Sequence, residues 1–188
     1  MPHRYFKLTD DVSIPGRWEL GEPTDLHGQE VDPWQFTKGK AVQVNERLRV
    51  PVKRPGQSLD FSFTSLATPI VHTRVAALLA GLAPTDVQFL PVELGSLPDQ
   101  YRLLVATRLV RCIDDQRSAE VKYWKPEDGR PEKIGEYRAV YGLRIEPSKV
   151  GDASVFRTWG WDIALIVSEE IRDALECLGA TGTKFKQV

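Results

Sequence analysis

The chain has 188 residues, of which 41% are hydrophobic, and this combination is typical of one globular domain spanning residues 1–188. Its 25 basic and 26 acidic residues leave a net charge of −1, which supplies neither a basic face for nucleic acid nor an acidic mimic of it. The N-terminus lacks an apolar segment of signal-peptide length, and no apolar run approaches a membrane span. We therefore predict a cytoplasmic protein that binds neither nucleic acid nor membrane.

Residues 1–65 are predicted to form a loop-rich region packed on the core. A short strand is expected at Arg4–Leu8, but turn-forming dipeptides such as Pro15-Gly16 then recur too often for a long helix. The alternation in Arg47–Val52 predicts another strand, which Pro51 places at a sheet edge. Aromatic residues in such a region usually fix it to a core. Three are present here: Trp18, Trp34 and Phe36.

Residues 66–99 are predicted to form the first of two similar units, each made of a strand, a helix and a second strand. Ile70-Val71 suits a buried strand, and apolar residues at helical spacing follow it. We expect Thr73 to cap this helix and Pro84 to end it. A second strand is expected at Val87–Leu90.

Residues 100–188 are predicted to combine an antiparallel meander with the second unit. The meander has four expected strands: Tyr101–Ala106, Leu109–Ile113, Ala119–Trp124 and Tyr137–Ile145. The second unit begins with a strand at Ile163–Val167 and continues into a helix that Ser168 caps and Gly179 ends. A final strand is expected at Thr183–Phe185.

The two units are linked by a sequence repeat. Ile70–Val92 aligns with Ile166–Val188 without a gap, and the two share seven of 23 residues, where chance gives roughly one or two. We therefore predict an α+β fold with a mixed, mainly antiparallel sheet and two short helices from a duplicated strand–helix–strand unit. A chance match between two amphipathic units is the alternative. Polar positions that differ between the copies are expected to face solvent: His72/Ser168, Arg74/Glu170 and Gln88/Lys184.

The sequence offers no catalytic, cofactor or metal site. It contains no phosphate-binding loop and no nucleophile elbow. None of the histidines has a second metal ligand at suitable spacing: these are His3, His27 and His72. Cys112 and Cys177 are expected to be two small buried side chains, with no disulfide or metal between them. Adjacent acids such as Asp114 and Asp115 are expected to end a strand in a turn.

The five tryptophans give the best indication of a binding surface, because Trp, Tyr and Arg are the usual anchors of protein interfaces. Trp124 precedes a polar loop and is expected to be the most exposed of the five. Core packing is the alternative for each. The candidate partner-binding residues are Trp124, Lys125, Asp128, Arg130, Trp159 and Trp161.

Five stretches carry a family resemblance: PGRWELG at 15–21, RCIDDQRS at 111–118, GDASVFR at 151–157, IVSEEI at 166–171 and TGTKF at 181–185. Together they resemble the eleventh family of immunity proteins of bacterial polymorphic toxin systems. The resemblance covers most of the chain and is strongest over residues 100–188. It implies that the protein neutralises a cognate toxin, and it carries over no catalytic residue.

The leading hypothesis is a non-enzymatic protein that neutralises a cognate toxin by contact. One alternative is an enzyme with a cryptic hydrolase-like site, which would need Cys112, His72 or the Asp114-Asp115 pair to converge in a pocket. Another is a self-associating structural protein, in which edge strands or Trp-bearing loops form a homodimer.

Overall fold

The computed structural model describes residues 4–188, apart from the side chain of Pro98. His3, considered above as a metal ligand, lies outside the described residues. Residues 4–188 form two five-stranded sheets, two two-stranded ribbons and two α-helices. Most strand pairs are antiparallel, which confirms the predicted α+β class.

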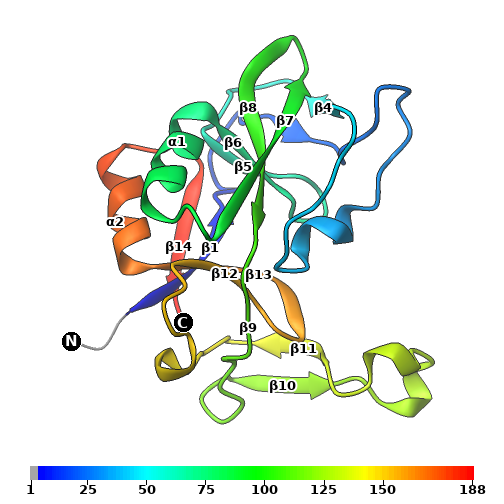
Figure 1. Cartoon of the computed structure of the whole chain (residues 1–188), viewed down its shortest axis with the longest axis vertical. Coiled ribbons are helices and arrows are strands. Elements are labelled where there is room, and N and C mark those ends of the chain that lie inside the picture. The colour runs from blue at the N-terminus through cyan, green and yellow to red at the C-terminus, as the bar shows by residue number, and fades with distance from the viewer. Residues whose placement is uncertain (1–3) are drawn as a thin grey trace.

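One sheet is built largely from the C-terminal part of the chain. Its strands are Tyr5–Asp10 (β1), Leu109–Val110 (β9), Val155–Thr158 (β12), Trp161–Ser168 (β13) and Thr183–Gln187 (β14). Their order is β14-β1-β13-β12-β9, in which the β12–β9 pair is parallel and the others are antiparallel. The strand predicted at Arg4–Leu8 is thus an inner strand, held between β13 and β14 (Figure 1).

The other sheet is built from the middle of the chain. Its strands are Leu48–Val50 (β3), Phe61–Phe63 (β5), Pro69–His72 (β6), Val87–Leu94 (β7) and Leu97–Ala106 (β8), in the order β3-β7-β8-β6-β5. The strand expected at Arg47–Val52 divides at Pro51: β3 is an edge strand, and Val52–Arg54 (β4) pairs with Glu19–Leu20 (β2). Proline has no N–H to give to a ladder, which explains the division.

The two predicted units have the same arrangement. Thr73–Leu82 (α1) connects β6 to β7, which flank β8, and Glu169–Cys177 (α2) connects β13 to β14, which flank β1. Two triplets of facing residues show the register: Ile70–Leu103–Leu90 and Ile166–Lys7–Lys186. Ile166 corresponds to Ile70 in the sequence repeat, and Lys186 corresponds to Leu90. Each unit therefore pairs with its middle strand in the same register. An origin by duplication remains a prediction from the sequence.

The helices pack against each other and enclose a core between the two sheets (Figure 1). Val75 and Leu79 of α1 and Ile171 and Leu175 of α2 are all buried in this core. Ser168 caps α2 as predicted, through its hydroxyl and the Ile171 N–H. The prediction of Thr73 as the cap of α1 is wrong.

His72 takes that position in α1. Its backbone is extended, and its Nδ1 accepts a hydrogen bond from the Arg74 N–H at 3.2 Å. Thr73 is instead the first helical residue. An imidazole nitrogen thus satisfies one of the free N–H groups at the helix start, where a hydroxyl was expected.

The loop-rich region covers the outer face of the β3–β5 sheet. Trp18 and Phe36 are buried there, and the indole N–H of Trp18 donates to the Ser62 hydroxyl at 2.8 Å. These two aromatics therefore fix the region to the core, as predicted. Trp34 does not, because 43% of it is exposed.

The predicted meander over 101–145 is wrong. Its first strand, β8, is the central strand of one sheet, whereas β9 adds to the other sheet. Glu120–Tyr123 (β10) and Tyr137–Tyr141 (β11) form a ribbon outside both sheets, at the bottom of Figure 1. The physical reason is burial: five of the six residues Tyr101–Ala106 in β8 are buried, which suits the centre of a covered sheet, while the ribbon is largely exposed.

Candidate partner-binding cleft

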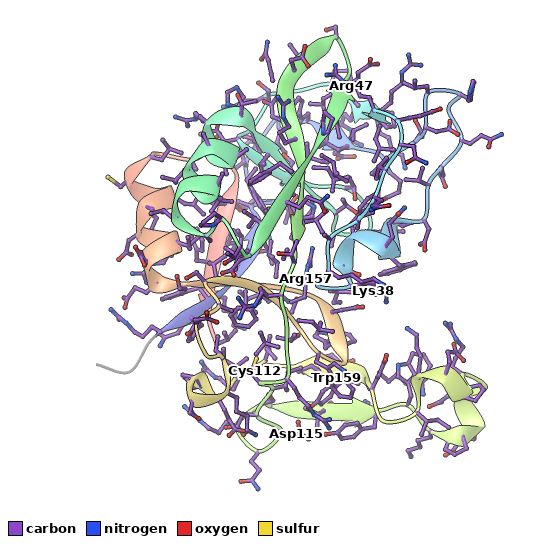
Figure 2. All side chains as sticks on the ribbon, in the orientation of Figure 1. Lys38, Arg47, Cys112, Asp115, Arg157 and Trp159 are labelled. Carbon is purple, nitrogen blue, oxygen red and sulfur yellow. The ribbon has the colours of Figure 1, made fainter. Side chains whose placement is uncertain are left out.

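A cleft of about 440 Å³ lies where three segments distant in the sequence meet. Its walls come from the short 3₁₀ turn Pro33–Thr37 with the following Lys38, from the β10–β11 connection, and from the start of β13. Each segment contributes one tryptophan: Trp34, Trp124 and Trp161. We call this feature the Trp cleft. Figure 2 shows Lys38 above the ribbon, with Trp159 and Asp115 beside the ribbon.

Cations surround the indole of Trp124. Arg130, Lys133 and Arg138 place their charged groups 6.0, 5.5 and 5.5 Å from its ring centroid. Each such contact stabilises by roughly 0.5–1 kcal/mol at an exposed site. Because these side chains cover the ring, Trp124 is half-buried, and Trp34 is the more exposed tryptophan. The prediction that Trp124 is the most exposed of the five is therefore wrong.

Ion pairs hold the charged side chains around the Trp cleft in place. Lys38 reaches across to Asp162 at 2.8 Å, and Arg138 contacts Asp128 at 2.6 Å. Arg130 contacts Glu132 at 2.7 Å. Exposed pairs of this kind stabilise folding little, but they fix the directions of long side chains. Each arginine bonds its acid through one nitrogen, and its remaining N–H groups are available to acceptors from a partner.

A pair of tyrosines fixes the ribbon beneath the Trp cleft. The rings of Tyr123 and Tyr137 stack at 4.8 Å, and both hydroxyls donate to the Asp115 carboxylate. The hydrogen bond to Asp115 raises the pKa of Tyr123, while burial and then the same carboxylate raise the pKa of Tyr137. Both hydroxyls therefore remain donors at neutral pH, and the hydrogen bond and stacking hold Tyr137 in place in the cleft wall.

Gly160 brings the start of β13 close to this wall. It has a φ of +78°, and a Cβ built on it would lie 3.0 Å from a carbon of the Tyr137 ring. A larger residue would be strained there and would push the ring away. Behind the Trp cleft, Arg157 is fully buried and donates to the Ile163 carbonyl at 2.9 Å. Burial lowers its pKa to about 10, so it stays charged at neutral pH.

The comparison with known families decides which class of protein carries this cleft. The model of the immunity protein family Imm11 matches residues 2–188, which is essentially the whole chain. The protein belongs to the Imm11 immunity protein family. This confirms the resemblance seen in the sequence. None of the curated proteins matches the chain.

In this Imm11 protein, three of the six candidate partner-binding residues converge on the Trp cleft: Trp124, Arg130 and Trp161. Lys125 and Asp128 line an adjoining hollow of about 580 Å³. Trp159 lies apart, with the Arg111 guanidinium 4.2 Å above its ring. The sequence reasoning missed Trp34, Lys38, Lys133, Tyr137 and Arg138. Of these, Trp34 carried a signal, because it is a large aromatic in a loop.

The residues considered for a cryptic enzymatic site do not come together. Cys112 is fully buried, and burial raises the pKa of its thiol to about 12, so it is not a thiolate at neutral pH. His72 is occupied as the cap of α1 on the other sheet. Asp114 accepts the N–H groups of Gln116 and Arg117 in a turn, as predicted for a strand end.

Other sequence expectations have mixed outcomes. Cys177 is exposed, which corrects the prediction that both cysteines are buried, because it lies on the outer side of α2. Among residues 4–188, no group of three or more His, Cys, Asp or Glu side chains is placed to hold a metal ion. Across the same residues, neither helix has the length and apolar character needed to cross a membrane.

Proposed function

We propose that this Imm11 protein neutralises a cognate toxin by binding it, without catalysing a reaction, and that the Trp cleft is the centre of the contact. Family membership supports the toxin-neutralising role. The observation that carries the contact surface is the convergence of Trp34, Trp124 and Trp161 on one hollow rimmed by basic side chains. Tryptophan and arginine are the residues that most often dominate the binding energy of protein interfaces.

The geometry supports binding by a rigid anchor site. The Trp cleft is formed by the scaffold before any partner arrives, so little conformational entropy is lost on association. A side chain from the toxin would fill the space between Trp34 and Trp161, and the arginine N–H groups would meet acceptors at the rim. A stable interface covers roughly 800 Å² per partner, so the neighbouring ribbon and the Pro33–Thr37 turn would contribute too.

We further propose that residues 1–188 act as one domain in the cytoplasm. The core between the sheets takes buried side chains from both strand–helix–strand units, which supports a single folding unit. Cys112 and Cys177 are both free, which suits a reducing compartment.

The test is a direct binding measurement with the toxin encoded beside the gene for this protein. We expect the wild-type chain to bind the toxin, and Trp34→Ala to weaken binding by about tenfold or more. Because Trp34 is exposed, its replacement should leave folding intact. Trp159→Ala is the matched control, since it removes a tryptophan outside the cleft and should change the affinity little.

Two results would contradict this proposal. Failure of the wild-type chain to bind at micromolar concentration would remove this toxin as a partner. Equal losses for Trp34→Ala and Trp159→Ala would show that the Trp cleft is not the centre of the contact. Light scattering of the free protein would show separately whether the chain associates with itself.

A further inference from the structure

The β10–β11 ribbon is incomplete as a sheet. A two-stranded ribbon is marginal by itself and usually gains stability from a third strand or from packing. Tyr137 and Val140 of β11 pack against the core of the neighbouring sheet. β10 pairs with β11 along one edge, and its other edge has no strand partner among residues 4–188. The outer edge of β11 is bonded at Tyr137, whose N–H donates to the Gly160 carbonyl at 3.0 Å, so the freer edge is on β10.

Three other outer strands are covered or protected: β3, β5 and β14. The edge of β3 is closed by reciprocal hydrogen bonds between Arg49 and Thr24, and the β5 edge by the bond from the Phe61 N–H to the Thr181 carbonyl. β14 carries two exposed lysines, the residue type that most often guards a sheet edge: Lys184 and Lys186.

The lysine on β10 does not guard that strand in the same way. Lys122 pairs with Glu120 at 3.2 Å, and its ammonium lies 5.7 Å from the ring centroid of Tyr141 on β11. The side chain is thus folded over the face of the ribbon. It leaves the outer backbone groups of β10 free to accept another strand.

A hollow runs along this open edge. It has a volume of about 580 Å³, and three successive residues of β10 line it: Val121, Lys122 and Tyr123. Successive strand residues point to opposite faces, so a hollow that touches all three must follow the strand edge. Arg138 lines both this hollow and the Trp cleft, which makes the two surfaces continuous.

From these observations we propose that β10 receives an extended segment of the toxin as a third strand of the ribbon. The assignment of this segment to the toxin rests on the proposed function. The open edge selects an extended backbone, because only an extended backbone can match its row of N–H and C=O groups. Val121 and the partly exposed Tyr123 lie on one face, and the charged Glu120 and Lys122 lie on the other. The segment should therefore alternate apolar and polar residues.

Amide hydrogen exchange of the free protein and of its toxin complex tests this assignment. In the complex, the outward-pointing amides of Glu120–Tyr123 should exchange at least about tenfold more slowly, while those already bonded to β11 change less. A complex that forms without slowing these amides would overturn the assignment and leave the proposed function standing. Absence of any complex would overturn both.

Proline substitution gives an independent test, because proline removes a single N–H. Glu120→Pro, Val121→Pro and Lys122→Pro are each compared with alanine at the same position. If the proline and alanine variants unfold at the same temperature, the N–H that proline removes is not bonded to β11 and points outward. Such a proline variant should bind the toxin about tenfold more weakly than its alanine counterpart. Equal binding by such a pair would overturn the proposal.

A second copy of this chain is the competing occupant of the edge. If it binds there, the β10 amides of the free protein will be protected at high concentration and will lose this protection on dilution. That result would assign the edge to self-association and overturn its assignment to the toxin.

Discussion

The two strand–helix–strand units share their register but use their polar positions differently. Arg74, near the start of α1, donates to both oxygens of Asp60 at 2.8 and 2.6 Å. It also donates to the carbonyls of Leu178 and Gly179 at the end of α2. Glu170, at the corresponding position of α2, is exposed. Both residues are exposed, but only Arg74 of the first unit ties the two units together.

Gln88 and Lys184 show the same difference. The Gln88 amide both accepts from and donates to the backbone of Val42, each at 2.8 Å, whereas Lys184 is exposed on the edge strand β14. The prediction that the unshared polar positions face solvent therefore holds for Arg74, which is exposed despite its hydrogen bonds, but it is wrong for Gln88, which is half-buried. The shared apolar positions set the common shape, and the unshared polar positions of the first unit attach other segments to it.

The largest expected effect tests whether the units share one core. Leu79 and Leu175 are corresponding residues, both fully or almost fully buried in the core between the sheets. Leu79→Ala and Leu175→Ala should each lower the free energy of unfolding by about 3 kcal/mol, measured by urea denaturation. Similar losses are expected because both cavities open in the same core. A loss below about 1 kcal/mol in one variant would contradict a shared core.

The next effect concerns the link that only the first unit makes. Burial alone would raise the pKa of Asp60, but hydrogen bonds from Arg74 and Thr181 lower it from 3.8 to about 2. Taken in full, this difference would correspond to about 2 kcal/mol at neutral pH, but solvent screening at the exposed Arg74 reduces it to about 1 kcal/mol. Asp60→Asn should lose about that much, whereas Glu170→Gln, at the exposed counterpart of Arg74, should change stability by less than about 0.5 kcal/mol.

The same link predicts a pH dependence. Because the pKa of Asp60 is lower in the folded state, the unfolded state binds more protons as the pH falls below about 4. The stabilisation is complete above that range and is lost as the pH approaches 2. Urea denaturation at several pH values should therefore show the difference between wild type and Asp60→Asn shrinking between about pH 4 and pH 2. A constant difference would show that the carboxylate charge is not the cause.

Local patterns in the sequence predicted the two units well. Ser168 and Gly179 bound α2 as expected, because caps and left-handed helix ends depend on nearby residues. For α1 the pattern indicates Thr73, because hydroxyl side chains are the commoner caps, but the neighbouring His72 takes this position. The pairing of β8 with β9 was also predicted wrongly, because neighbouring strands in the sequence were assumed to pair. Instead, the buried β8 lies in the middle of one sheet, and β9 lies at the edge of the other.

The candidate site was predicted only in part. Trp124, Arg130 and Trp161 were chosen as interface anchors by residue type, and the fold brings them to one cleft. Trp34 lies 90 positions before Trp124 in the sequence, and no local pattern indicates that they meet. Trp159 was chosen for the same reason, but it lies outside the cleft and contacts Arg111 instead. Binding of a partner by any of these residues remains a prediction.

The helix caps give a smaller contrast between the units. Loss of an N-cap costs about 1 kcal/mol, and we expect this for Ser168→Ala. His72→Ala should cost somewhat more, because the imidazole also meets the Tyr101 ring edge-on at 5.2 Å. Thermal unfolding measures both. His72→Asn should restore the cap but not the ring contact, so full recovery in this variant would remove the ring contact from the explanation.

The smallest expected effect separates attachment from global stability. Gln88→Ala removes both hydrogen bonds to Val42, but the sheet and cores beneath remain, so the free energy of unfolding should fall by only about 1 kcal/mol. The Val42 amide should exchange faster, and proteases should cut nearby sooner, because nothing else replaces the lost pair. Lys184→Ala, at the exposed counterpart, should change neither measurement. If Gln88→Ala leaves the Val42 amide as protected as before, the first unit does not hold this segment, and the functional contrast between the units would rest on Arg74 and Asp60 alone.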